Sequence, residues 1–155
     1  MDLDACISEL KLNSQKEYEE YVSVLEKHRE ILACEIDANP KNIRAASLLA
    51  MVHFELREST KVSIRCLKDA YKKNYGELSD DELAMLATNL AYFYIEEYSY
   101  TGNVVRNLLK KAIQANSPFA ETYFALAILY YGDHKYNEAL PLFKKACDMS
   151  VQFRY

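Results

Sequence analysis

The chain has 155 residues, of which 50% are hydrophobic and 27% charged, and its net charge is −4. A chain of this length and composition can bury the core of one domain, and its three Gly and three Pro argue against a turn-rich all-β fold. No run approaches the roughly 18 apolar residues of a membrane span, and the acidic start MDLDACISEL lacks the basic and apolar regions of a signal peptide. We therefore expect an all-α protein that does not bind a membrane.

The cysteines indicate the cellular compartment, and the charge distribution argues against one class of partner. The four cysteines stand far apart, with no CxxC and no zinc spacing, which predicts reduced residues on apolar helix faces and a cytoplasmic protein. Residues 1–40 carry ten acids and four bases, so this segment is acidic, and it argues against binding of nucleic acid. The cysteines are Cys6, Cys34, Cys66 and Cys147.

Residues 1–41 predict a helical hairpin. Residues 1–12 form a short amphipathic segment, and Ser14-x-x-Glu17 is a capping box that opens a second helix. That helix should end near Asp37, because Asn39-Pro40 disfavours helical backbone. Its apolar stripe is Tyr18, Tyr21, Val22, Leu25, Leu32 and Ile36.

The next segment, residues 42–75, predicts a second helix pair. Asn42 is a favoured N-cap residue, and a polar break at residues 57–59 separates its helix from the next. The second helix carries a small, a large and a small residue on one face, at Ser63, Leu67 and Ala70.

A third pair follows over residues 80–117. Ser79-x-x-Glu82 is another capping box, and a second helix begins near Thr101 and ends at Asn116-Ser117-Pro118. The small, large, small spacing recurs in it at Val105, Leu109 and Ala112.

The most regular pattern lies in AETYFALAILYYGDHKYNEALPLFKKACDMS, residues 120–150. Two apolar helix faces are separated by a polar break at Gly132-Asp133-His134. Ala127 and Ala139 have short side chains that let two helices approach closely. The apolar positions are Tyr123, Leu126, Ala127, Tyr130, Tyr136, Ala139, Leu140, Phe143, Ala146 and Cys147.

This stretch resembles the tetratricopeptide repeat, a helix–turn–helix unit of 34 residues. Repeat starts near residues 44, 84 and 120 give intervals of about 40 and 36, which also suit Sel1-like repeats, a close variant with glycine-rich loops. The resemblance implies a right-handed superhelix, or α-solenoid, of antiparallel helix pairs. It implies about three repeats (residues 42–75, 80–117 and 118–151) after the hairpin of residues 1–41, which is a divergent repeat or a cap.

In this family a concave groove binds a peptide or helix of a partner protein. Members that bind acidic chaperone tails hold the terminal carboxylate with Lys, Asn and Arg. Asn89 fits this pattern, but Glu121 and Ala125 stand where Lys and Arg are needed. An apolar groove rimmed by acids instead suits an amphipathic helix or an extended apolar peptide with some positive charge. Carried over to this chain, the groove residues are Leu48, Leu49, Val52, Glu55, Thr88, Asn89, Tyr92, Ile95, Glu96, Glu121, Phe124, Ala125, Ile128 and Tyr131.

Catalysis is not predicted. The sequence contains no P-loop, GxGxxG or GxSxG motif, and its three histidines have no local catalytic or metal-binding partners. We expect His28 on a solvated charged helix, His53 at a large repeat position and His134 in a polar turn. The prediction is a non-enzymatic protein-interaction adaptor or scaffold without metal or cofactor.

Two alternatives remain open at the level of the sequence. The repeats could associate with themselves as a homo-oligomer, or belong to a larger helical-repeat protein. The groove could also be filled by the N-terminal hairpin or by a second copy of the chain, because an open apolar patch lowers solubility.

Overall fold

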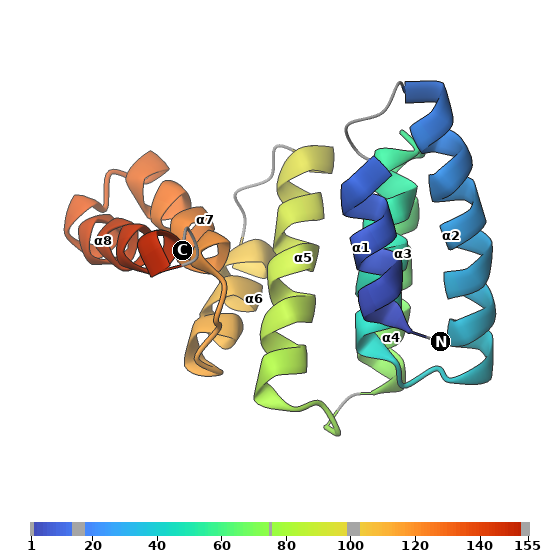
Figure 1. The fold of residues 1–155 in the computed structure, drawn as a ribbon. Coiled ribbons are helices and arrows are strands. Elements are labelled where there is room, and N and C mark those ends of the chain that lie inside the picture. Colours follow the sequence, from blue (N-terminus) through green and yellow to red (C-terminus); the bar gives the residue numbers. More distant parts are fainter. Residues whose placement is uncertain (1, 14–17, 75, 99–102, 153–155) are drawn as a thin grey trace. The chain divides into compact units, whose positions relative to one another are not determined.

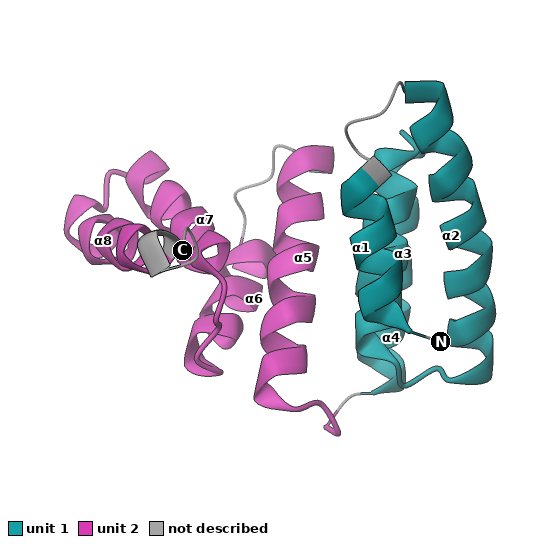
Figure 2. Cartoon of the chain, viewed as in Figure 1, with its two compact units in different colours: residues 1–75 teal, residues 76–155 magenta. Residues whose placement is uncertain are grey.

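The structure is a computed structural model that describes residues 2–13, 18–74, 76–98 and 103–152. Within these ranges the chain forms eight helices and no strand (Figure 1), so the predicted all-α fold is confirmed. The helices group into two compact units, residues 1–75 and residues 76–155 (Figure 2). The predicted capping box of Ser14 and Glu17 lies outside the described residues.

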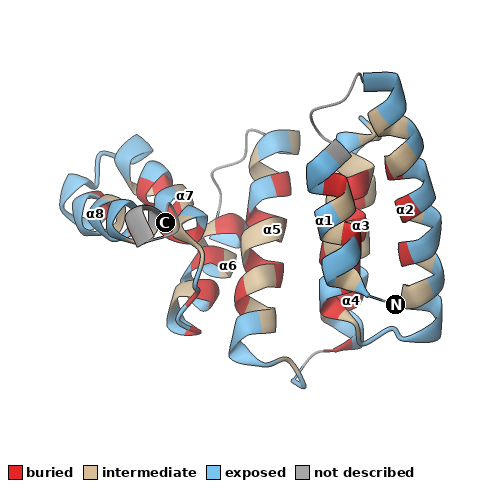
Figure 3. Cartoon of the chain, in the orientation of Figure 1, coloured by how far each residue is buried: buried red, intermediate tan, exposed pale blue. Residues whose placement is uncertain are grey.

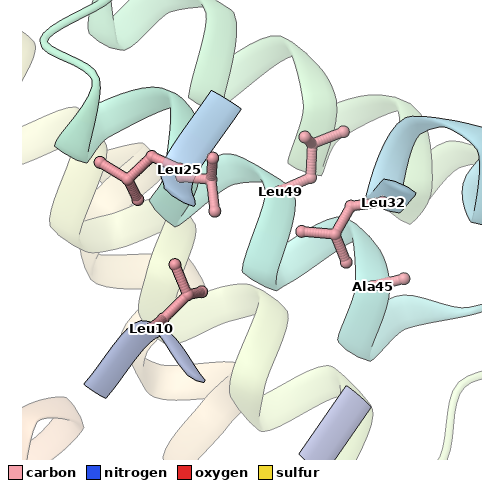
Figure 4. Close-up of a cluster of buried hydrophobic side chains, with 6 residues drawn as sticks. Leu10, Leu25, Leu32, Ala45 and Leu49 are labelled. Atoms are coloured by element: carbon pink, nitrogen blue, oxygen red, sulfur yellow. The ribbon is translucent and has the colours of Figure 1, made fainter. Parts of the chain in front are cut away.

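Unit 1 contains α1 (Leu3–Asn13), α2 (Tyr18–Ala38), α3 (Ile43–Glu55) and α4 (Thr60–Lys73). Each helix packs against the next one in the chain. One core cluster joins the first three helices (Figure 4), so the N-terminal hairpin covers a face of α3. The buried members of this cluster are Leu10, Leu25, Leu32, Ala45, Leu49 and Val52.

The crossing of α3 and α4 depends on the small residue at its centre. Ser63 is fully buried, and its hydroxyl donates a 2.7 Å hydrogen bond to the carbonyl of Ala50. A larger side chain would separate the two backbones, because close helix crossings need short side chains. The predicted N-cap is confirmed as well: the Asn42 side chain accepts a 3.0 Å hydrogen bond from the amide of Ala45.

Unit 2 contains α5 (Asp80–Tyr98), α6 (Asn103–Gln114), α7 (Ala120–Gly132) and α8 (Tyr136–Gln152). The predicted capping box opens α5: the Ser79 amide donates to Glu82 Oε2 at 2.9 Å, and the Glu82 amide donates to Ser79 Oγ at 3.3 Å. A second core cluster joins α5, α6 and α7. Its buried members are Ala91, Val105, Leu109, Leu126 and Leu129.

Three helices end in the same turn, and none of the three turns uses glycine. Arg57, Asn116 and His134 have φ of 55°, 51° and 60°, the left-handed region that closes a helix C-terminus. In each turn the amide of the following residue donates back to a carbonyl five residues earlier, as from Lys135 to Tyr130 at 2.9 Å. This shared turn explains how the chain reverses so often with three glycines.

The structure corrects the predictions for four side chains. His28 is 2% exposed rather than solvated, with its Nε2 3.2 Å from Glu9 Oε2. Tyr18 is exposed, although it was expected in the apolar stripe of α2. Cys34 and Cys147 are also exposed, although both were expected on apolar helix faces.

Candidate interaction surface

The predicted groove residues of α3 are mostly occupied by the chain itself. Leu49 and Val52 belong to the buried core cluster, and Leu48 packs against that cluster from its edge. Only Glu55 is exposed. In unit 1 the face that was expected to bind a partner is therefore the face on which α1 and α2 lie.

The predicted residues of α5 have mixed environments. Tyr92 is 43% exposed, and its ring meets Phe93 edge-on at 5.4 Å. Glu96 is exposed, Asn89 is half-buried, and Ile95 packs partly against the core cluster of unit 2. Tyr92 is thus the large apolar side chain of this set that a partner could cover.

Thr88, the remaining predicted residue of α5, links this helix to α7. Its hydroxyl donates to the Ala84 carbonyl at 2.7 Å and lies 2.7 Å from the hydroxyl of Thr122. A hydroxyl has one proton, so Thr122 must donate to Thr88. Ser117 Oγ, 2.7 Å from Thr122 Oγ1, must in turn donate to Thr122. A directed chain of hydrogen bonds therefore runs from Ser117 through Thr122 and Thr88 to the Ala84 carbonyl. This chain fixes α7 against α5.

The contact between α6 and α7 is also polar at its edge. Arg106 Nη1 donates to Asp133 Oδ2, and this hydrogen bond holds the pKa of the Asp133 carboxyl below its ordinary value. Lys110 lies over the ring of Tyr130, 5.9 Å from its centroid. These contacts place the start of α8 relative to α6, because Asp133 begins the turn that joins α7 to α8.

The predicted residues of α7 form an exposed apolar stripe. Phe124, Ile128 and Tyr131 are 51%, 47% and 59% exposed, and their spacing puts them on one side of the helix. Glu121 is exposed one turn before Phe124, whereas Ala125 packs partly into the core. Three of the five predicted side chains of α7 therefore present contiguous apolar area.

Helix α8 extends this stripe with residues that the groove prediction omitted. Tyr136 and Leu140 are 52% and 70% exposed, and most of α8 is exposed in Figure 3. Ring contacts join the two helices at both ends: Phe124 with Phe143 at 5.7 Å, and Tyr131 with Tyr136 at 5.3 Å. We call this surface the α7–α8 face. It consists of Phe124, Ile128, Tyr131, Tyr136, Leu140 and Phe143.

Tyr136 and Leu140 were missed because both belong to the apolar face of the second helix, which was expected to pack internally. For Phe143, the equivalence of the helix pairs in unit 2 gives a signal. Leu109 of α6 corresponds to Phe143 of α8, since each lies between two small residues at the same spacing. Leu109 is fully buried against α7, whereas Phe143 is only half-buried. Helix α7 covers Leu109 of the α5–α6 pair, whereas Phe143, the corresponding side chain of the α7–α8 pair, is less covered.

A shallow groove of about 280 Å³ lies at the Phe124 end of the α7–α8 face. Its walls come from the first turn of α7 and the later part of α8: Ala120, Glu121 and Phe124 on one side, Ala146 and Cys147 on the other. The lining is apolar except for Glu121. This groove can accept an apolar side chain of a partner next to a negative charge.

A charged cluster in unit 1 has a structural explanation. Glu58 accepts 2.8 Å hydrogen bonds from Arg29 and from His53, which ties the turn after α3 to α2. Burial raises the pKa of the Glu58 carboxyl, but these hydrogen bonds outweigh burial and lower it overall. Among the described residues, no group of three or more His, Cys, Asp or Glu is placed to hold a metal ion.

No helix in the described part of the chain is long and apolar enough to cross a membrane. No protein-family model matches the chain, and no curated protein is significantly similar to it in sequence.

Solved structures of MamA, a tetratricopeptide-like helical-repeat protein, are similar to the chain in three dimensions. The MSR-1 protein is 19% identical, with a TM-score of 0.54 over 96% of this chain and 94% of that one. A second MamA structure is 17% identical, with a TM-score of 0.57 over 99% of this chain and 82% of that one. A double mutant of the RS-1 protein is 13% identical, with a TM-score of 0.57 over 91% and 70%. At these identities the likeness establishes the fold, which is that of a helical-repeat protein.

Proposed function

We propose that the chain is a non-enzymatic protein-interaction module, an adaptor or scaffold that binds an apolar segment of a partner protein. The observation that carries this proposal is the exposed stripe of Phe124, Ile128 and Tyr131 on α7. Isolated exposed apolar side chains are ordinary, but a contiguous patch of aromatic and aliphatic side chains marks an interaction site. Tyrosine suits such a site because it offers a large rigid surface with a polar end.

The proposed binding residues are those that the fold leaves accessible. In unit 2 these are Tyr92 on α5 and the stripe on α7, with Glu96 and Glu121 as exposed acids on the same helices. An amphipathic helix with apolar residues at intervals of three and four, and with a basic residue at its edge, fits this combination. In unit 1 the equivalent face of α3 is filled by the N-terminal hairpin, and we assign it no partner.

The test compares the proteins that co-purify with three forms of the chain from its own cell, counted by quantitative mass spectrometry. The double substitution Tyr92→Ala with Phe124→Ala should reduce recovery of specific partners about tenfold or more, because buried aromatic side chains carry much of the binding free energy. A matched control is Leu12→Ala, which removes a 77% exposed leucine on α1. If the double variant recovers the same proteins as the wild type, in the same amounts, the proposal is wrong.

A further inference from the structure

A cavity of about 510 Å³ in unit 1 combines aromatic rings with carboxylates. It lies between the start of α2, the end of α3 and the turn that leads into α4. Its volume falls within the range of roughly 300–1,000 Å³ that is usual for ligand pockets, so it can admit a long side chain. The side chains that line it include Tyr18, Tyr21, Phe54, Glu55, Arg57 and Glu58.

One ring of this cavity already carries a cation. The guanidinium carbon of Arg57 lies 4.8 Å from the centroid of the Tyr18 ring, within the roughly 6 Å of a cation–π contact. Because Tyr18 is 49% exposed, a cation from outside can reach the same ring. The chain itself therefore shows which chemical group this ring accepts.

The two carboxylates of the cavity differ in their surroundings. Glu58 accepts hydrogen bonds from Arg29 and His53, so its charge is already compensated. Glu55 is exposed, and within the described ranges its carboxylate makes no hydrogen bond or ion pair. Burial and, after it, the Glu55 charge raise the pKa of the Tyr21 hydroxyl, so this carboxylate lies near a second ring. Glu55 is thus the anion of the cavity that is available to an incoming cation.

We propose that this cavity binds the guanidinium of an arginine side chain of a partner protein, and that Arg57 fills part of the site until the partner arrives. The incoming guanidinium stacks on Tyr18 in place of Arg57 and faces the Glu55 carboxylate. Arginine suits both contacts, because its planar guanidinium stacks on aromatic faces and donates two parallel hydrogen bonds to a carboxylate. The site goes beyond the proposed function, since it shares no residue with the α7–α8 face.

Arg57 can leave the ring without disturbing the fold. It is exposed in the turn after α3, and backbone hydrogen bonds hold this turn, from the Arg57 amide to Phe54 and from the Glu58 amide to His53. Exposed cation–π contacts are weak, so a competing guanidinium can replace that of Arg57. Two guanidinium groups on one ring face repel each other, and Arg57 and a partner arginine therefore compete for the site.

An NMR titration with N-acetyl-arginine-N-methylamide tests the site, because the guanidinium is the only charge of this probe. We expect saturable shifts of the amides around the turn between α3 and α4, with a Kd in the millimolar range for the wild type. Arg57→Asn should bind the probe about two- to fivefold more tightly, since it frees the Tyr18 ring and asparagine tolerates the left-handed backbone at φ 55°. The citrulline probe, which has the same shape without the charge, should bind about fivefold or more weakly, and the lysine probe should also bind less tightly than arginine.

Substitutions in the Arg57→Asn background locate the probe within the cavity. Tyr18→Leu should weaken binding about two- to fivefold, whereas Tyr18→Phe keeps the ring and should leave the affinity unchanged. Glu55→Gln should also weaken binding about two- to fivefold. Its matched control is Glu26→Gln, an exposed acid of α2 outside the lining, which should bind the probe like the background. Circular dichroism should show all these variants folded.

Four results overturn the proposal. The first is the absence of saturable binding in both the wild type and Arg57→Asn, and the second is an affinity of Arg57→Asn no higher than that of the wild type. The third is a citrulline or lysine probe that binds as tightly as the arginine probe. The fourth is a Tyr18→Leu variant that binds as well as Tyr18→Phe. None of these results bears on the co-purification experiment, which decides separately about the proposed function.

Discussion

The hydrogen-bond chain from Ser117 to Ala84 predicts that Thr122→Val destabilises unit 2 more than Ser117→Ala does. In Thr122→Val the shape of the side chain is kept, but the Ser117 proton loses its acceptor while Ser117 remains 2% exposed. A stranded buried donor costs about 1–3 kcal/mol. In Ser117→Ala no hydroxyl proton is stranded, since Thr122 still donates to Thr88. Only the half-buried Phe119 amide loses its long 3.3 Å hydrogen bond to Ser117 Oγ, so the cost should be about 1 kcal/mol.

The double variant provides the decisive comparison. With Ser117→Ala and Thr122→Val together, Thr88 still donates to Ala84 and no buried hydroxyl is left without an acceptor. The Phe119 amide loses its hydrogen bond to Ser117 Oγ here as it does in Ser117→Ala alone. The double variant should therefore be at least as stable as Thr122→Val alone, with a coupling of about 1 kcal/mol or more between the two sites. Hydrogen exchange of the buried amides of α5 and α7 measures these differences, and the amides of α3 and α4 in unit 1 serve as an internal control.

Two results would refute this reasoning. One is a Thr122→Val variant no less stable than Ser117→Ala. The other is a double variant whose cost equals the sum of the single costs, because a directed chain requires that removal of both hydroxyls is cheaper than the sum.

Three further predictions concern the core, the pH dependence and the thiols. Leu109→Ala should lower the free energy of unfolding of unit 2 by about 2–5 kcal/mol, because Leu109 is fully buried. The control Val104→Ala, on the exposed side of α6, should change this free energy by less than about 0.5 kcal/mol. Urea titration measures both changes. The pKa of Glu58 lies below its ordinary value of 4.5, so its stabilisation is complete above that pH and is lost as the pH falls through the lower folded-state pKa. Glu58→Gln should make acid unfolding of unit 1 less steep, and an unchanged acid titration would contradict this. Burial raises the pKa of Cys66 to about 11, so little of this thiol is ionised at about pH 8. Iodoacetamide at that pH should therefore label the exposed Cys34 and Cys147 well before Cys66, which peptide mass spectrometry can show. Equal labelling rates would contradict the burial of Cys66.

Local signals in the sequence predicted most of the helices, and the reason is that these signals act over a few residues. The N-cap at Asn42 and the capping box at Ser79 are confirmed by their hydrogen bonds. The small residues at helix crossings are confirmed by their burial, as with Ser63. His28 could also have been placed correctly, since it lies three residues after Leu25 and four before Leu32 on the buried stripe of α2.

The candidate surface was harder to predict because it depends on contacts between segments far apart in the sequence. Nothing local to α3 shows that Leu49 and Val52 are covered by the N-terminal hairpin. Nothing local to α5 shows that Thr88 is bound to a hydroxyl on α7. The repeat signature gives the positions that are equivalent in each helix pair, but the packing of the neighbouring helix decides which of them remain accessible.

The same equivalence supports the proposed interaction surface. Within each unit, a helix face is covered by neighbouring helices. The hairpin of α1 and α2 covers the inner face of α3, and α7 covers the pair of α5 and α6 through Leu126, Leu129 and the chain of hydroxyls. On the α7–α8 pair the corresponding side chains are Phe124, which is 51% exposed, and Phe143, which is half-buried. In a helical-repeat fold such faces are buried by a neighbouring helix, and we propose that a partner molecule covers the α7–α8 face in the same way.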